Sequence, residues 1–175
     1  MDYITKPTSR ATLRKMAPIF RKVFNVKNKG AFPVLKVLEE LPDVFPGCNY
    51  EVVPDNKLPA NTMAQCYHNE NPTGYTIEIK ESVYRRAYNM VGADLGFICH
   101  ELCHIFLFKL GFTPIHERSF EDSKLPAYCS VEWQAKALCG EVMIPREESK
   151  EMCASEIVEY YHVSWAFAKH RLGIR

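Results

Sequence analysis

The sequence predicts an α+β fold in which helices at both ends of the chain surround a small, mainly antiparallel sheet. Residues 1–42 and 130–172 carry apolar side chains at helical spacing. Between them, short segments rich in aromatic and β-branched residues lie between positions 50 and 80 and predict strands. A long apolar segment at 95–110 then predicts a buried helix beside that sheet.

Length and composition indicate a globular protein. At 175 residues the chain suits one domain, which we expect to comprise a helical N-terminal part (1–42), a core with the sheet and the candidate site (43–145), and a small helical C-terminal part (146–175). Hydrophobic residues make up 47% of the chain and charged residues 25%, which excludes global disorder. Because 22 Lys and Arg nearly balance 21 Asp and Glu, no overall charge attracts nucleic acid or a membrane surface.

The cysteines and the N-terminal residues indicate the cellular compartment in which we expect the protein. Seven cysteines, an odd number without a C-x-x-C pair, argue against a disulfide framework and against a cysteine zinc ribbon. Residues 1–10 contain no apolar signal-peptide segment, and the most apolar run, 102–108, is too short to span a bilayer. We therefore expect a soluble, cytoplasmic protein with reduced cysteines and no membrane association.

Two helices are expected before the sheet. Thr8 or Ser9 can cap the first helix, which Pro18 should kink or interrupt. The second helix should begin at Pro33 and end at Pro42.

Three strands are predicted, at 50–53, 64–68 and 75–80. Turn-forming residues at 69–74 separate the last two and predict an antiparallel hairpin. A helix over residues 81–90 and a loop around Gly92 should lead into the apolar helix, which Gly111 would end.

The predicted apolar helix contains His100-Glu101-Leu102-Cys103-His104, an H-E-x-x-H motif. Residues four apart lie on one face of a helix, so the two imidazoles can converge on a single ion. Imidazole nitrogen suits zinc, and Glu101 is placed to take a proton from an attacking water. The alternative is two core histidines and a helical glutamate, but their polar groups would need other partners in an apolar segment. The motif therefore predicts a metal site on a buried helix, with Zn2+ as the expected ion and manganese or iron as the alternatives.

A catalytic zinc of this type needs a third protein ligand and an open fourth position. Leu107 and Leu110 stand where a metzincin-like motif would have glycine and a further ligand, so that class is excluded. The third ligand must come from elsewhere in the chain. The downstream candidates are His116, Glu117, Glu121, Asp122, Glu132 and Glu141.

Helical periodicity favours Glu132 among these candidates. Residues 130–142 predict a helix with Ser130 as its N-cap. Apolar residues follow Glu132 at offsets of 3, 6, 7 and 10, which places its carboxylate on the inward face. An inward carboxylate needs a partner, and a metal would provide one. The alternative is a carboxylate in the first helical turn that complements the helix dipole and stays solvated.

The chain resembles the ImmA/IrrE family of zincin-like metallopeptidases, a group associated with regulation of mobile genetic elements and stress responses. The resemblance rests on the blocks at 76–79, 83–88, 97–104, 132–139, 142–145 and 163–172. It implies a zincin-like fold with Zn2+ held by His100, His104 and Glu132. It also implies peptide-bond hydrolysis with Glu101 as the general base. By the same resemblance, the substrate is expected to be a helix-turn-helix transcriptional repressor that binds DNA.

The chain departs from the family pattern at three places. Cys103 replaces a usual glycine, residues 92–95 replace a basic stretch, and Phe108 stands where a histidine is often found. None of these is a primary metal ligand. Cys103 is expected to be a small buried hydrophobe, the alternative being an additional sulfur ligand or a side chain that crowds the site.

The C-terminal part predicts two short helices capped by Ser155 and Ser164. A helical lid that packs Trp165 and Phe167 on the core is favoured over a DNA-binding helix-turn-helix. The reason is that Lys169, Arg171 and Arg175 form only a small basic patch. We therefore expect no direct contact with nucleic acid.

Two other function classes remain as alternatives to a peptidase. One is a catalytically weak or inactive sensor or scaffold that uses the same metal-binding fold. The other is a DNA-binding regulator that acts through the C-terminal helices. For the peptidase, Tyr128 or His116 could stabilise the developing oxyanion, and spacing alone does not separate them from ordinary loop residues.

Overall fold

The computed structural model describes residues 3–115 and 125–174. Its helices are α1 (Arg10–Val23), α2 (Val34–Glu39), α3 (Leu41–Val44), α4 (Glu81–Tyr88), α5 (Gly92–Lys109), α6 (Val131–Met143), α7 (Arg146–Ser149), α8 (Ala154–Tyr161) and α9 (Trp165–Leu172), with 3-10 turns at Asp55–Lys57 and Ala127–Cys129. Its strands are β1 (Asn49–Val53), β2 (Ala64–His68) and β3 (Tyr75–Lys80). This content confirms the predicted α+β class.

The sheet is mixed, with the strand order β1-β3-β2. β2 and β3 form the predicted antiparallel hairpin, in which Ala64 pairs with Ile79 and His68 with Tyr75. β1 instead runs parallel to β3. No tight turn joins those two strands, because β2 lies between them in sequence, so turn chemistry could not predict their relative direction. β2 is left as an edge strand.

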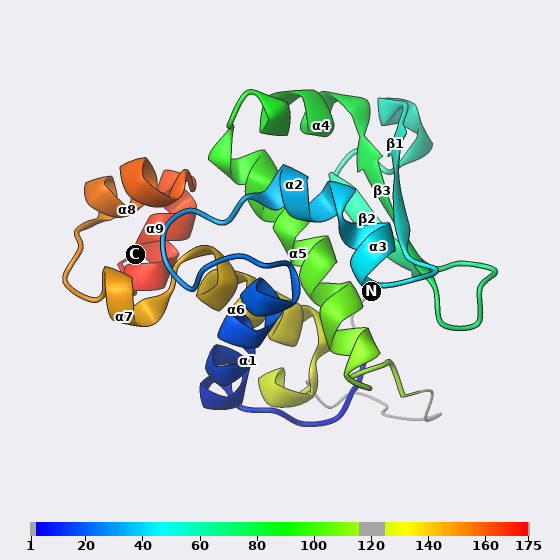
Figure 1. Ribbon diagram of the computed structural model, residues 1–175, viewed down its shortest axis with the longest axis horizontal. Helices are drawn as coiled ribbons and strands as arrows, with labels where there is room; N and C mark the ends of the chain where they lie inside the picture. Colours follow the sequence, from blue (N-terminus) through cyan, green and yellow to red (C-terminus); the bar gives the residue numbers. More distant parts are fainter. Residues whose placement is uncertain (1–2, 116–124, 175) are drawn as a thin grey trace.

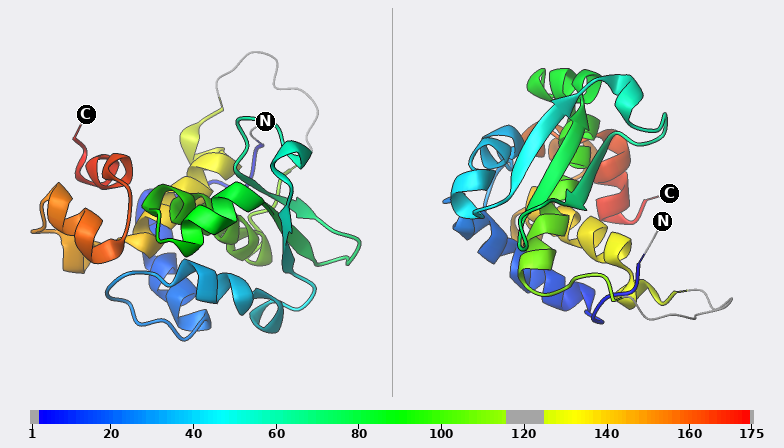
Figure 2. Two further views of the ribbon diagram at one scale, coloured as in Figure 1. Left: turned by 90° about the horizontal axis from the view of Figure 1, so that it is seen from above. Right: turned by 90° about the vertical axis from the view of Figure 1, so that its right-hand side faces the viewer.

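α5 is the central helix of the fold. It crosses the middle of the molecule between the sheet and α6, and α1 packs against α6 (Figure 1). The sheet lies toward one end of the molecule and α7, α8 and α9 lie at the other (Figure 2). None of the described helices is by itself long and apolar enough to cross a bilayer. Because α5 lies between the sheet and α6, polar side chains on its covered faces lie inside the protein and need partners there.

The N-terminal helices differ in detail from the prediction. Ser9 caps α1 by accepting a hydrogen bond from the Thr12 N–H, but the helix continues through Pro18 without interruption. Packing of its buried face outweighs the hydrogen bond that proline removes. The helix predicted at 33–42 is divided into α2 and α3, because Pro42 lies in the first turn of α3 and has no N–H to continue the ladder of α2.

Gly92 and Asp94, from the segment 92–95 that the sequence analysis singled out, have structural contacts at the start of α5. A Cβ atom on Gly92 would lie 2.5 Å from the carbonyl carbon of Val163, so the loop between α8 and α9 approaches the α5 backbone closely. Asp94 is buried and accepts two hydrogen bonds from the Arg86 guanidinium, at 3.0 and 2.8 Å. This end of α5 is therefore adapted to hold the C-terminal helices.

The C-terminal helices pack on the core through a different set of residues from the one predicted. Ser164 caps α9 as expected, whereas α8 is capped by Cys153 instead of Ser155. Phe167 packs against the core, but Trp165 is 56% exposed, so the prediction that both rings pack inward is wrong for Trp165. A short helix cannot direct both positions 165 and 167 to the same face.

Glu141 joins three helices through a buried ion-pair cluster. Its carboxylate is 1% exposed and accepts hydrogen bonds from Arg171 of α9 at 2.9 and 3.0 Å. Arg14 and Arg10 of α1 contact the same carboxylate at 3.2 and 3.4 Å. Glu141 is thus committed to a structural role and is not a metal ligand. Arg171 is also held in this ion pair, which weakens the alternative in which the C-terminal helices bind DNA.

Replacing Glu141 by glutamine is expected to lower the free energy of unfolding at pH 7 by about 3 kcal/mol, because removing one partner leaves buried charges uncompensated. Burial raises the pKa of Glu141, but hydrogen bonds from Arg171 and Arg14 outweigh it and the net pKa is lowered. The contribution is therefore present above the unfolded-state pKa of about 4.3 and is lost as the pH falls through the folded-state value. Urea unfolding from pH 7 to pH 3 measures both effects.

Glu147→Gln is the matched control, since Glu147 is exposed on α7 and its loss should change stability by less than about 0.5 kcal/mol. The difference between wild type and Glu141→Gln should shrink below about pH 4. Equal stability of wild type and Glu141→Gln at pH 7 would contradict the proposed role of the ion-pair cluster.

Candidate metal centre

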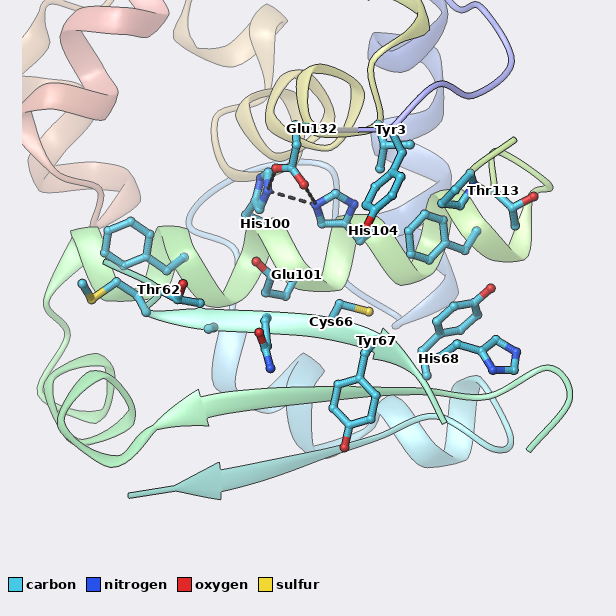
Figure 3. A pocket seen from close by; sticks show the side chains of 18 of the residues that line it. Tyr3, Thr62, Cys66, Tyr67, His68, His100, Glu101, His104, Thr113 and Glu132 are labelled. Carbon is cyan, nitrogen blue, oxygen red and sulfur yellow. Dashed lines mark hydrogen bonds and ion pairs between the residues drawn. The ribbon is translucent and has the colours of Figure 1, made fainter. Parts of the chain in front are cut away.

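Three donor groups from α5 and α6 meet at one point. The His100 and His104 Nε2 atoms lie 3.1 Å apart. Glu132 Oε2 lies 3.1 Å from His100 Nε2, and Glu132 Oε1 lies 3.5 Å from His104 Nε2 (Figure 3). A tetrahedral ion with bonds of about 2.0–2.1 Å holds its ligand atoms about 3.3 Å apart. The donor atoms thus already have the spacing that zinc requires.

Helix geometry explains how each donor reaches this point. His100 and His104 are one turn apart on α5 and leave the same face of the helix. Ser130 caps α6 by accepting a hydrogen bond from the Trp133 N–H at 2.8 Å, which fixes the start of that helix. Glu132 therefore lies in the first turn of α6, opposite the two imidazoles. Its side chain is 51% exposed, so the carboxylate faces the histidines from the solvent side of the site.

The charges at this point favour a cation. Hydrogen bonds from His100 and His104 lower the pKa of Glu132 well below its usual value, so the carboxylate stays ionised. Burial lowers the pKa of His100, but the hydrogen bond to Glu132 and the charge of Glu101 outweigh it, and the net pKa is raised. His104 also has a buried Nδ1 atom without a hydrogen-bond partner in the described part of the chain. A metal bond at Nε2 would offset the cost of burying that ring.

Glu101 lies beside the two histidines and faces β2 (Figure 3). Donor atoms of His100, Glu101 and His104 all lie within 4.8 Å of one another. Burial raises the pKa of Glu101, and the charges of the histidines only partly offset this. A carboxylate with a raised pKa suits a group that must accept and later release a proton near neutral pH.

These side chains line a cavity of about 1000 Å³ between α5 and β2. Residues of β2, including Gln65 and Tyr67, form one wall, and Thr113 lies at one end (Figure 3). Within residues 3–115 and 125–174, the β2 edge that faces the cavity is not paired with another strand. An exposed strand edge of this kind can take up an extended peptide through backbone hydrogen bonds.

Tyr3 is a cavity residue that sequence analysis missed. Its side chain reaches into the cavity beside His104 (Figure 3). Backbone hydrogen bonds hold its segment in place, from Val131 N to Tyr3 O at 3.0 Å and from Ile115 N to Ile4 O at 2.8 Å. These contacts join segments that lie more than 100 residues apart in the sequence, and no local pattern around Tyr3 could have indicated them.

The other candidates from the sequence are described by the structure only in part. Tyr128 is 55% exposed and does not line the cavity. The candidate ligands His116, Glu117, Glu121 and Asp122 lie outside the described residues. Phe108 lines the cavity with its ring centroid 5.6 Å from that of His104. Cys103 is fully buried and groups with Cys99 and Cys139, so it neither crowds the histidines nor joins their donor set.

A buried helix that presents two imidazoles and a glutamate, next to a small sheet with an open edge strand, defines a zincin-like metallopeptidase domain. Residues 57–173, about two thirds of the chain, match the family model of peptidase M78, described as an IrrE N-terminal-like domain. The chain therefore belongs to this family, which confirms the resemblance to the ImmA/IrrE metallopeptidases. No curated protein matches the chain significantly.

Proposed function

We propose that the protein is a zinc-dependent endopeptidase that hydrolyses a peptide bond in a protein substrate. The observation that supports this most strongly is the convergence of His100, His104 and Glu132 in a cavity that also holds Glu101. His₂Glu is a donor set of catalytic zinc sites, and it leaves one coordination position for water or substrate.

We assign each part of the hydrolysis to residues of the chain. His100, His104 and Glu132 hold the ion, which when bound would polarise the scissile carbonyl and acidify the attacking water. Glu101 accepts a proton from that water and later passes a proton to the leaving amine. The β2 edge binds the substrate as an added strand and so orients the scissile bond along α5.

Tyr3 is our candidate for the group that donates a hydrogen bond to the carbonyl oxygen as negative charge develops there. Removing one such donor typically slows an acyl-transfer enzyme by about 100-fold or more. We therefore expect Tyr3→Phe to lower kcat by about that factor, with little change in KM, fold or metal content. Steady-state kinetics on a cleaved peptide measures the effect.

Tyr128→Phe is the matched control, because Tyr128 lies outside the cavity and its hydroxyl should not affect kcat. A Tyr3→Phe variant that turns over at the wild-type rate would remove Tyr3 from the mechanism. A slow Tyr128→Phe variant would restore the assignment that the sequence suggested.

We further propose that the substrate is a cytoplasmic helix-turn-helix repressor that binds DNA, so that cleavage relieves repression. The support is the family resemblance together with the extended cavity wall. A segment that binds along β2 must first leave its own folded domain, and a flexible linker or a fraying helix end does so at the lowest cost.

Co-expression with a repressor encoded nearby tests this proposal. Repressor length is followed by mass spectrometry in cells that also make wild type or Glu101→Gln. We expect fragments with wild type only. An intact repressor with both proteins, while wild type still cleaves other peptides, would contradict the substrate assignment and leave the peptidase proposal standing. No hydrolysis of any peptide by the metal-loaded protein would favour the sensor alternative.

A further inference from the structure

A second set of donor groups lies between α5 and α6, separate from the histidines. Cys99 and Cys103 are fully buried, and Cys139 is 3% exposed. Their three sulfur atoms all lie within 4.8 Å of one another. No disulfide joins them. Three thiols from two helices therefore point at one small volume inside the core.

The sulfur set has the same construction as the candidate zinc site. Each set takes two residues one turn apart on α5 and a single residue from α6. Glu132 and Cys139 are seven residues apart, which is two helical turns and places them on the same side of α6. The packing of α5 on α6 thus creates two convergent three-donor sets, one of nitrogen and oxygen and one of sulfur alone.

Donor chemistry restricts what the sulfur set can bind. Thiolates select soft, thiophilic ions, and hard ions such as Mg2+ or Ca2+ require oxygen ligands. Structural zinc is held by four protein ligands, whereas the described residues offer three sulfurs here. An ion that is satisfied by three sulfurs therefore suits the set better than zinc does.

The charge of the bound ion further restricts which ions the three sulfurs can hold. Three thiolates around a monovalent or divalent ion would leave net negative charge in the core, which is costly to bury. A trivalent ion with three thiolates is uncharged. At a pyramidal trivalent ion, ion–sulfur bonds of about 2.3 Å place the three sulfurs about 3.5 Å apart. The present sulfur atoms lie within 4.8 Å of one another, so small side-chain rotations are enough.

We propose that Cys99, Cys103 and Cys139 form a binding site for a trivalent thiophilic ion of the arsenite class. Arsenous acid, As(OH)3, would react with the three thiols to give As(SR)3 and three molecules of water. Three As–O bonds break and three As–S bonds form, the thiol protons leave with the hydroxides, and no atom is oxidised or reduced. A cavity of about 600 Å³, lined by Cys139, Gly96 and Phe167, reaches one of the three cysteines and gives a small uncharged solute a path of approach to Cys139.

The test uses the reduced, zinc-loaded full chain incubated with sodium arsenite and then desalted. We expect one arsenic per chain by elemental analysis and a mass gain of one arsenic less three hydrogens by native mass spectrometry. Of the seven thiols in the chain, three should become protected from alkylation, and peptide mapping should identify these as the cluster thiols. Zinc content should not change, because the two donor sets share no residue.

Variants separate this site from ordinary thiol reactivity. Cys99→Ala, Cys103→Ala and Cys139→Ala should each bind arsenic roughly 100-fold more weakly, because each loses one arm of a three-point attachment. Cys153→Ala is the matched control, since Cys153 is exposed and outside the cluster, and it should bind as wild type does. If a cysteine variant fails to fold, peptide mapping of the wild-type protein still identifies which cysteines bind the arsenic.

Three results would overturn the proposal. The first is wild type that retains no arsenic, both after native incubation and after refolding with arsenite. The second is arsenic that protects cysteines outside the cluster. The third is preferential filling of the three sulfurs by Cu(I) or zinc in competition with arsenite, which would contradict the trivalent assignment.

Discussion

Replacing Glu101 by glutamine is expected to slow peptide hydrolysis by about 100-fold or more while leaving fold and metal content unchanged. The amide has nearly the size of the carboxylate but cannot accept a proton at neutral pH. Glu101 lies within the same 4.8 Å group as His100 and His104, yet its side chain turns toward β2 (Figure 3). Hydrolysis of a fluorogenic peptide, circular dichroism and elemental analysis on the same preparation measure the three quantities.

Glu70→Gln provides the matched control, because Glu70 is exposed in the β2–β3 turn and does not line the cavity. That variant should cleave at the wild-type rate. If Glu101→Gln also cleaves at that rate, Glu101 is not the general base or the observed activity belongs to a contaminating protease. Chelator sensitivity of the residual activity separates a metallopeptidase from a contaminant of another class.

Replacing Glu132 by alanine is expected to reduce the zinc content from about one ion per chain to less than about one tenth in dialysed protein. The carboxylate contacts both imidazoles, at 3.1 and 3.5 Å, and its loss leaves two neutral ligands where a catalytic site has three protein ligands. Hydrolysis should fall in proportion to metal content. Elemental analysis against protein concentration, with circular dichroism as a check on folding, measures the loss.

Glu147→Ala is the control for this experiment. Glu147 lies in the first turn of α7, so it resembles Glu132 in its place on a helix but is exposed and far from the histidines in sequence. That variant should keep its metal. A Glu132→Ala protein with unchanged zinc content would show that the third ligand has been misassigned.

Much of the candidate site could be predicted from the sequence because it depends on helical periodicity. His100 and His104 are one turn apart whatever surrounds them, and the apolar pattern after Glu132 fixes the side of α6 from which it projects. Both helices occur close to the predicted positions. The pattern could not show that Glu132 would be half exposed while it contacts both imidazoles.

The features of the candidate site that escaped prediction depend on contacts between distant segments. Tyr3 reaches the cavity because the N-terminal segment pairs with residues near the start of α6. Glu141 instead pairs with arginines of α1 and α9. Cys103 was expected to be a small buried hydrophobe, and it is buried. Cys139 comes close to Cys103 only because α6 packs on α5. Periodicity gives the face of each helix but not the partner that covers it.

The most direct test of the metallopeptidase assignment is anomalous X-ray diffraction at the zinc absorption edge from crystals of the wild-type protein. We expect one strong peak per chain, with His100 Nε2, His104 Nε2 and a Glu132 carboxylate oxygen at about 2.0–2.2 Å. A peak bound by other residues, or no peak in protein purified with zinc present, would contradict it.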